Sequence, residues 1–203
     1  MKVIGLCGGS GSGKGAVSRI FLKYGIPSVD TDALYREMTS SEGECMSALI
    51  SAFGPSVAND DGSLNRETLR TIVFRGDNKD TKRTLLNEIT HKFILKKTRA
   101  LISEYRQQNK EFALIDAPLL FESGFDRECD FTLAILADRE KRIERIISRD
   151  GITREAAEAR IDTQLSDCEL AKMADFTITN NSTPEQLCKS VQEFISKIKT
   201  SEK

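Results

Sequence analysis

The chain carries at residues 8–14 the stretch Gly8-Gly9-Ser10-Gly11-Ser12-Gly13-Lys14, directly after a short apolar run. This stretch fits G-x-x-x-x-G-K, the pattern of loops that bind nucleotide phosphates between a strand and a helix. Its glycines let backbone N–H groups turn inward around an anion, and the N-terminus of the next helix adds positive partial charge. Lys14 can reach the outer phosphates. The stretch therefore predicts an α/β fold that binds a nucleotide.

The positions after the lysine depart from this pattern. Ser or Thr usually follows the lysine, and its hydroxyl binds Mg²⁺. Here Gly15 and Ala16 follow Lys14. We expect Mg²⁺ to be held by the phosphates, by water or by another side chain, and we expect Gly15→Ser to tighten Mg²⁺ binding.

Short apolar runs separated by helical patterns continue the fold along the chain. The expected strands are Lys2–Cys7, Ile26–Val29, Phe112–Asp116, Phe131–Ala137 and Phe176–Thr179. Nearly continuous apolar strands that alternate with helices are typical of a parallel sheet covered on both faces. The sequence predicts a three-layer α/β/α P-loop NTPase fold with a five-stranded parallel sheet.

A long segment separates the second and third expected strands, far longer than one crossover helix needs. Helical patterns cover about Glu44–Phe53, Arg66–Phe74 and Asp80–Gln108, and Gly54-Pro55 marks a turn. We interpret this segment as a helical insert that binds the second substrate. The predicted parts of this single domain are a core at about 1–32, 111–138 and 170–203, an insert at about 33–110, and a lid at about 139–169.

Three aspartates follow predicted strands. Asp30 and Asp32 come after the second strand, and Asp116 ends the third. In an open parallel sheet ligands bind at the carboxyl ends of the strands. If the chain stays extended, Asp30 and Asp32 point to one side. A kinase needs one carboxylate near the acceptor hydroxyl and another near Mg²⁺, although such residues also cap helices.

Arginines follow the fourth expected strand at helical spacing. Arg142, Arg145 and Arg149 share one helical face. Small kinases use such arginines in a lid that neutralises charge on the transferring phosphate. The alternative is a solvated face with intrahelical ion pairs, because Glu140 and Glu144 lie between them.

The composition excludes several classes of protein. The 203 residues include 30 Lys or Arg and 31 Asp or Glu, and the net charge of −1 disfavours a general nucleic-acid binder. No apolar run approaches the roughly 20 residues of a membrane span. The five cysteines form no C-x-x-C pair, and one histidine leaves little material for a metal site. We expect a cytoplasmic protein with no membrane, no nucleic acid and no obligate protein partner.

Together these motifs resemble the dephospho-coenzyme A kinase family over nearly the whole chain. The resemblance rests on the loop from Ile4 to Lys14, Asp30-Thr31-Asp32 with Arg36, Asp116 to Glu122, Ser148 to Thr153, Arg160 to Gln164, and Asp175 to Asn181. It implies transfer of the ATP γ-phosphate to the ribose 3′-hydroxyl of dephospho-CoA, which gives coenzyme A and ADP. It also implies ATP and Mg²⁺ as cofactors.

The resemblance also implies roles for individual residues. The catalytic set is Asp32, as the base, with Lys14, Arg142 and Arg145. The nucleotide-binding set is Gly9, Ser10, Gly11, Ser12, Gly13, Lys14, Gly15, Ala16 and Asn180. The substrate-binding set is Asp32, Arg36, His91, Pro118, Leu119, Leu120, Phe121, Glu122 and Arg149. Asp116 is the candidate metal ligand.

Two further positions depart from the family pattern. Lys92 follows His91 where the family usually has Pro, and Ser182 follows Asn181 where it usually has Gly. His91 could therefore be a structural hydrogen-bonding residue, and the loop near adenine could differ slightly in shape. Nearby basic residues either form a solvated helix face or bind the pyrophosphate of the acceptor; the candidates are Lys92, Lys96, Lys97 and Arg99.

Two other functions fit parts of the pattern. Another small-molecule or nucleotide kinase could share the scaffold, and a substrate panel with ATP distinguishes it. A nucleotide-binding switch without turnover is favoured only by Gly15, and it would bind ATP without transfer to any acceptor.

Overall fold

The strand before the phosphate-binding loop lies in the middle of a five-stranded sheet. In the computed structural model, which describes residues 1–75 and 78–200, the strand order is β2-β3-β1-β4-β5. The strands are β1 (Lys2–Cys7), β2 (Ser28–Asp30), β3 (Phe112–Asp116), β4 (Phe131–Leu136) and β5 (Phe176–Thr179). The pairs β1–β3, β1–β4 and β4–β5 are parallel. The predicted five-stranded parallel sheet is confirmed.

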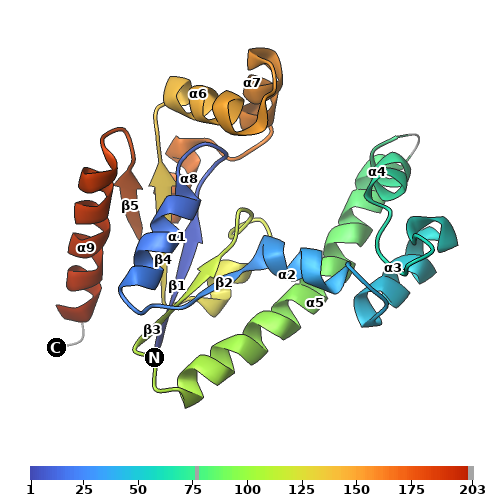
Figure 1. Cartoon of the computed structure of the whole chain (residues 1–203), viewed down its shortest axis with the longest axis horizontal. Helices are drawn as coiled ribbons and strands as arrows, with labels where there is room; N and C mark the ends of the chain where they lie inside the picture. Colours follow the sequence, from blue (N-terminus) through green and yellow to red (C-terminus); the bar gives the residue numbers. More distant parts are fainter. Residues whose placement is uncertain (76–77, 201–203) are drawn as a thin grey trace. The chain divides into compact units, whose positions relative to one another are not determined.

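Helices connect these strands (Figure 1). The α-helices are α1 (Lys14–Lys23), α2 (Thr31–Met38), α3 (Glu44–Phe53), α4 (Arg66–Phe74), α5 (Lys79–Gln107), α6 (Arg139–Asp150), α7 (Arg154–Asp162), α8 (Asp167–Met173) and α9 (Pro184–Thr200). Two short 3₁₀ helices are η1 (Pro55–Val57) and η2 (Phe125–Glu128). The helical patterns predicted near residues 44, 66 and 80 thus correspond to α3, α4 and α5.

The chain forms two compact units. The first contains Met1–Val29 and the chain from Tyr105 onward, and the second contains Asp30–Glu104. Residues 76–77, inside the predicted insert, and 201–203, at the end of the predicted core, lie outside the described residues.

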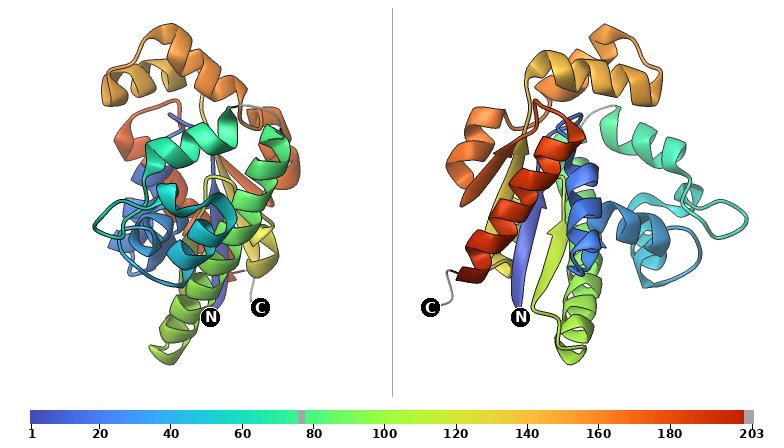
Figure 2. Two further views of the ribbon diagram at one scale, coloured as in Figure 1. Left: turned by 90° about the vertical axis from the view of Figure 1, so that its right-hand side faces the viewer. Right: turned by 60° about the vertical axis from the view of Figure 1, so that its left-hand side comes forward.

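The core of the first unit lies between the sheet and the helices that cover it. The helices α1 and α9 lie side by side on one face (Figures 1 and 2), and Phe21 of α1 meets Phe194 of α9 edge to face. Both pack against buried β-strand residues such as Ile4 and Leu133. The right-hand view of Figure 2 shows the strands between α1 and α8, and α8 contacts β4. This is the predicted three-layer arrangement.

The second unit has a core of its own. Leu49 of α3, Val57 of η1 and Val73 of α4 are each fully buried. Residues of α5 such as Phe93 pack against this cluster. Burial of such side chains is the main favourable contribution to folding.

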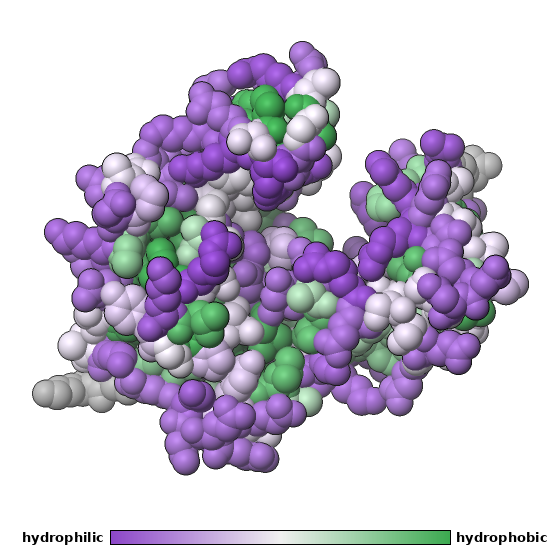
Figure 3. Space-filling model, viewed as in Figure 1, coloured by the Kyte–Doolittle hydropathy of each residue, from purple (hydrophilic) through white to green (hydrophobic). Residues whose placement is uncertain are grey.

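On the face shown in Figure 3, hydrophilic residues surround only small apolar patches.

The chain does not stay extended at Asp30-Thr31-Asp32, so the condition for Asp30 and Asp32 to point to one side is not met. The strand β2 ends at Asp30, and α2 begins at Thr31. The Asp30 carboxylate accepts a hydrogen bond from Ala33 N at 2.9 Å, so Asp30 caps the helix. Asp30 and Asp32 therefore do not share one side of a strand, and Asp32 lies in the first turn of α2.

Candidate active site

The phosphate-binding loop lies where the sequence predicts it, between β1 and α1. Gly13 has φ +97°, a left-handed conformation that favours glycine, and α1 begins at the next residue, Lys14. Within the loop, Ser12 N donates to Gly9 O at 3.0 Å. The N-terminal N–H groups of α1 are thus placed to receive an anion.

Lys14 and Asp116 meet at the carboxyl edge of the sheet. Asp116 ends β3, the neighbour of β1. Lys14 Nζ donates to Asp116 Oδ1 in an ion pair whose side chains are mostly buried. The pair brings together the predicted catalytic lysine and the predicted metal ligand.

Three predicted site residues hold the backbone of the loop. Arg142 Nε donates to Ser10 O at 2.9 Å, and Arg145 Nη1 donates to Gly11 O at 3.1 Å. Asn180 Nδ2 donates to Ser12 O at 2.8 Å. Arg145 Nη2 also donates to the Asn180 carbonyl oxygen at 2.9 Å. The guanidinium groups of both arginines therefore lie against the loop.

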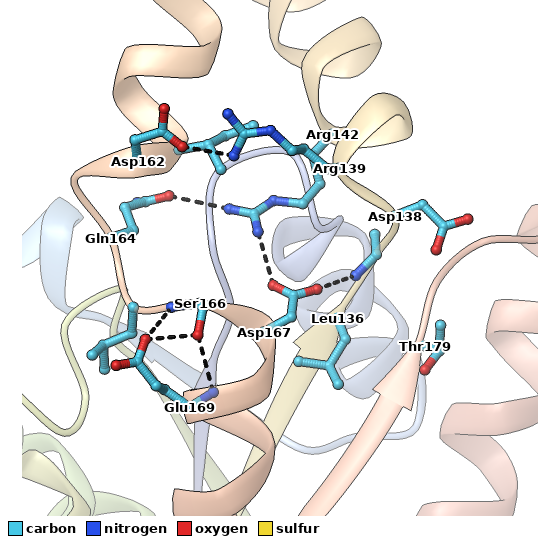
Figure 4. A pocket seen from close by; sticks show the side chains of 13 residues that line it. Leu136, Asp138, Arg139, Arg142, Asp162, Gln164, Ser166, Asp167, Glu169 and Thr179 are labelled. Atoms are coloured by element: carbon cyan, nitrogen blue, oxygen red, sulfur yellow. Dashed lines mark hydrogen bonds and ion pairs between the residues drawn. The ribbon is translucent and has the colours of Figure 1, made fainter.

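Gln164 and Asp167, which were not among the predicted site residues, contact Arg142 (Figure 4). Both residues line a cavity of about 710 Å³ that α6, α7 and α8 border. These contacts join residues that are distant in the chain, so no local sequence pattern predicts them. Gln164 is the last residue of the segment Arg160 to Gln164, which is part of the family resemblance. That resemblance is the sequence signal that could have identified Gln164 as a site residue.

Arg149 lies at the end of α6 and is bound to its neighbour. Its guanidinium donates twice to the Asp150 carboxylate, at 2.7 and 2.8 Å. Arg160 of α7 donates to the same carboxylate. Hydrogen bonds from Arg149 and Arg160 hold the pKa of Asp150 far below its usual value. Asp150 thereby links α6 to α7.

The segment Pro118–Glu122 follows Asp116 as a series of turns. Leu120 is fully buried, and a Cβ at Gly5 would lie 2.9 Å from its side chain. Leu119 is 45% exposed, and Glu122 is also exposed. Leu120 therefore fixes the segment to the core, while its neighbours lie at the surface.

The remaining predicted residues belong to the second unit. Asp32 and Arg36 are both exposed and lie one turn apart on α2, so they share a face. His91 is half-buried in α5, and burial lowers the pKa of its imidazole. His91 is therefore neutral near pH 7 and can donate or accept a hydrogen bond.

A cavity of about 340 Å³ lies within the second unit, and its lining begins at Glu37, the residue after Arg36. The residues that line it are Glu37, Met38, Ser41, Glu42, Gly43, Glu44, Cys45, Phe93, Lys96, Lys97 and Ala100. Lys97 Nζ lies 3.0 Å from Glu37 Oε1, and Lys96 Nζ lies 2.9 Å from Glu44 Oε2. The cavity thus combines apolar side chains with two lysines and three glutamates, and two of these glutamates pair with the lysines.

Space for a hydroxyl exists after the loop lysine. A Cβ at Gly15 would meet one atom within 4 Å, Arg19 Nη1 at 3.8 Å. Ala16 is the next residue of α1. Among the described residues no group of three or more His, Cys, Asp or Glu could hold a metal ion. A Mg²⁺ ion usually takes only one or two carboxylates beside substrate phosphates and water, which Asp116 alone can satisfy.

None of the helices in residues 1–75 and 78–200 combines the length and hydropathy that a membrane crossing requires.

Sequence comparison places this arrangement among kinases. A family model described as dephospho-CoA kinase matches residues 2–186. A dephospho-CoA kinase of Fusobacterium nucleatum subsp. nucleatum is 38% identical over 193 residues, which are 95% of this chain and 96% of that protein.

Solved structures resemble the whole chain. The crystal structure of TT1252 from Thermus thermophilus has a TM-score of 0.80 at 27% identity and covers 97% of both chains. Dephospho-CoA kinase from Campylobacter jejuni has a TM-score of 0.71 at 25% identity and covers 99% of this chain and 98% of its own.

Proposed function

This chain belongs to the dephospho-CoA kinase family, and we propose that it transfers the γ-phosphate of ATP to the ribose 3′-hydroxyl of dephospho-CoA. The products are coenzyme A and ADP, so the reaction is the last step of coenzyme A synthesis. The observation that carries this proposal is the phosphate-binding loop, with Lys14 beside Asp116 at the carboxyl edge of the sheet.

The first unit binds ATP in this proposal. The backbone N–H groups of the loop, from Gly9 to Gly13, and the N-terminus of α1 receive the phosphates. Lys14 leaves Asp116 for the outer phosphates and offsets the charge that develops during transfer. Asn180 supports the nucleotide site through its hydrogen bond to Ser12.

Asp32 is the proposed catalytic base. It is exposed in the first turn of α2, and the cap formed by Asp30 fixes the start of that helix. The Asp32 carboxylate orients the 3′-hydroxyl of the acceptor and accepts its proton as the O–P bond forms. Arg36, one turn further on, binds the acceptor beside it.

The cavity of the second unit supports a binding site for the rest of the acceptor. Along α2, Met38 lies about 9 Å beyond Asp32, from six residues at 1.5 Å each. The cavity thus begins at a distance that the ribose and first phosphates can span. Its apolar residues, such as Phe93, suit the pantetheine arm.

The lysines at this cavity support the same assignment. Lys96 and Lys97 each form an exposed ion pair, and such pairs contribute little stability. Either lysine can therefore exchange its glutamate for the pyrophosphate of the acceptor. His91 is a further acceptor-binding residue, which would act as a neutral hydrogen-bonding group.

Two arginines and one surface segment complete the proposed transfer site. The Arg145 guanidinium lies against the loop, where it would stabilise the transferring phosphate. Arg149 is held by an exposed pair with Asp150, which it can exchange for a phosphate oxygen. The exposed residues of Pro118–Glu122 lie beside the acceptor.

A Mg²⁺ ion fits the residues that are present. It would be held by the ATP phosphates, water and Asp116, because Gly15 has no hydroxyl. A bound Mg²⁺ ion would neutralise negative charge on the ATP phosphates during transfer.

We place the protein in the cytoplasm, where ATP is plentiful. The described structure contains no disulfide, and all five cysteines are free thiols. Free thiols agree with a reducing compartment. The proposal requires no partner beyond the two small-molecule substrates.

A substrate panel tests the function. The wild-type chain is incubated with ATP and with dephospho-CoA, adenosine, AMP or shikimate, and ADP release is measured with and without Mg²⁺. We expect the highest kcat/KM with dephospho-CoA. A preference for another acceptor, or ATP binding without transfer to any acceptor, would refute the proposal.

A further inference from the structure

Arg142 is one of the most buried charged side chains among the described residues, and its exposed fraction is 4%. Its guanidinium reaches three partners from different parts of the first unit. Nε donates to Ser10 O at 2.9 Å, and Nη1 donates to Asp167 Oδ1 at 2.8 Å. Nη2 lies 3.4 Å from Gln164 Oε1 (Figure 4). The guanidinium therefore joins the loop to the N-terminus of α8.

Gln164 binds the backbone N–H of the same loop residue, Ser10. Ser10 N donates to Gln164 Oε1 at 2.9 Å. The C=O and the N–H of Ser10 are thus both bound by side chains, one from Arg142 and one from Gln164. Two fixed hydrogen bonds define the orientation of the peptide groups on either side of Ser10.

Asp167 connects this pair to the sheet. Its second carboxylate oxygen accepts from Ala137 N at 3.0 Å, directly after β4. As the first residue of α8, Asp167 also lies where a helix favours negative charge. A continuous path of hydrogen bonds thus runs from the end of β4 through Asp167 and Arg142 to Ser10.

The loop has no room for a side chain at Gly9 or Gly11, where it packs against Arg142. A Cβ at Gly9 would overlap Arg142 Nη2, and a Cβ at Gly11 would lie 2.5 Å from the Arg142 carbonyl oxygen. Because these glycines have no Cβ, α6 can pack directly against the loop backbone.

The burial of Arg142 is better explained by geometry than by stability. Burial lowers the pKa of Arg142, and Asp167, whose side chain is 30% exposed, opposes that shift. Removing a charge from water is costly, so a largely buried ion pair adds little net stability compared with apolar residues. A planar guanidinium can, however, fix several acceptors at once.

We propose that Arg142 is a positioning residue for the nucleotide, and that with Gln164 and Asp167 it holds Ser10 in the orientation that the ATP phosphates require. This role replaces the direct contact with the transferring phosphate that the sequence predicts for Arg142. It rests on the proposed function, because it concerns the ATP site of the same reaction. Preorganising the loop lowers the entropy lost when the phosphates bind.

The second arginine–aspartate pair at the same cavity provides a matched control. Arg139 Nη1 lies 2.6 Å from Asp162 Oδ1, and both side chains are about half exposed. Neither residue contacts the phosphate-binding loop in any hydrogen bond of the described structure. Arg139→Lys and Asp162→Asn should therefore leave nucleotide binding unchanged within about 2-fold.

Two conservative variants test the proposal. Lysine in Arg142→Lys keeps the charge but cannot reach three acceptors. Arg142 and Ala137 donate to different oxygens of Asp167, and Asp167→Asn replaces one of these acceptors with an NH2 donor, so one of the two hydrogen bonds is lost. We expect each variant to raise the KM for ATP roughly 10-fold, the factor set by about one hydrogen bond. The kcat and the KM for dephospho-CoA should change less than about 3-fold, within the scatter of such effects.

Direct binding of a fluorescent ADP analogue separates positioning from other roles. We expect its Kd to rise in parallel with the KM for ATP. The double variant, with both Arg142→Lys and Asp167→Asn, should have about the same Kd as either single variant. A lower kcat with an unchanged Kd would assign Arg142 to the transferring phosphate. Equal effects in the control pair, or an unchanged Kd in a folded Arg142→Lys protein, would also overturn the proposal.

The binding measurement does not depend on the acceptor. If the wild-type chain fails to phosphorylate dephospho-CoA, the proposed function fails, yet the ADP Kd of each variant still tests the positioning of the loop. If transfer is normal and the ADP Kd is unaffected, the positioning role alone fails.

Discussion

At Gly9 a single hydrogen atom in place of a side chain decides how closely the loop and α6 approach. A Cβ there would overlap the Arg142 guanidinium, which is held by Ser10 and Asp167 and cannot swing away freely. At Gly11 the obstacle is the backbone of Arg142 itself. The glycines of the sequence motif thus serve the packing of the loop against α6 as well as its turn around an anion.

Gly15 offers a test of the altered magnesium ligation. The position is helical with open space around it, so Gly15→Ser should be accommodated without a clash. The new hydroxyl stands at the position that usually binds Mg²⁺. We expect the Mg²⁺ concentration for half-maximal activity to fall, measured at a fixed total ATP concentration.

Gly15→Ala is the control for this change, because it adds a Cβ without a hydroxyl. An unchanged Mg²⁺ requirement in Gly15→Ser, or an equal shift in both variants, would show that the hydroxyl does not reach the ion.

At the scale of elements, residue patterns predicted the strands and most of the insert helices closely. Apolar runs marked β1, β3 and β5 with the bounds that the structure has. At Asp30-Thr31-Asp32 the sequence left two possibilities open, an extended segment and a helix cap, and the structure has the cap. A capping bond between Asp30 and Ala33 instead favours a helix from Thr31.

Asp150 gives a prediction for the pairing of α6 with α7. Asp150→Asn keeps the size of the side chain but removes the charge that binds Arg149 and Arg160. We expect faster amide hydrogen exchange in α7, measured at constant pH by mass spectrometry, with the sheet strands unchanged. Unchanged exchange in α7 would mean that its apolar contacts, such as Ile161 with Ile146, suffice to hold it.

The same pair has a defined pH dependence. The pKa of Asp150 is lowered in the folded protein, so its contribution to stability is present above the unfolded pKa of about 4 and is lost as the pH falls below it. The difference in Tm between wild type and Asp150→Asn should therefore shrink in thermal scans below about pH 4. A difference in Tm that does not decrease as the pH falls from about 4 toward the lowered pKa of Asp150 would contradict the assignment of the charge.

Across the whole molecule, the sequence predicted the parts of the site that lie in contiguous motifs. It did not predict the contacts between residues that are distant in the chain. The loop, Lys14 and Asp116 follow from strand ends and a contiguous motif. The contact of Gln164 with Ser10 spans 154 positions and that of Arg142 with Ser10 spans 132, so only the folded chain reveals them. The spacing of Arg142 and Arg145 predicted a shared face, but not that the face packs on the loop.

The division into two units predicts separable effects on the two substrates. Ala100 is exposed and lines the cavity of the second unit, so Ala100→Leu should fill the cavity without disturbing the buried core. We expect a higher KM for dephospho-CoA, by about 10-fold if one apolar contact is lost to the larger side chain, and an unchanged KM for ATP. Steady-state kinetics with each substrate varied checks both values.

A truncated acceptor is the control for the cavity. AMP has the ribose 3′-hydroxyl but lacks the pantetheine arm, so Ala100→Leu should not change its KM. Equal increases for AMP and dephospho-CoA would show that the cavity does not hold the arm.

Transfer to the ribose 3′-hydroxyl with Asp32 as the base can be tested by comparing the wild type with one variant. The rate of coenzyme A formation from ATP and dephospho-CoA is measured by mass spectrometry for the wild type and for Asp32→Asn. The wild type should yield coenzyme A, and Asp32→Asn should lower kcat by about 10²-fold or more, with a nearly unchanged KM for dephospho-CoA. A near-normal kcat in Asp32→Asn, or ADP release by the wild type without coenzyme A, would contradict the account.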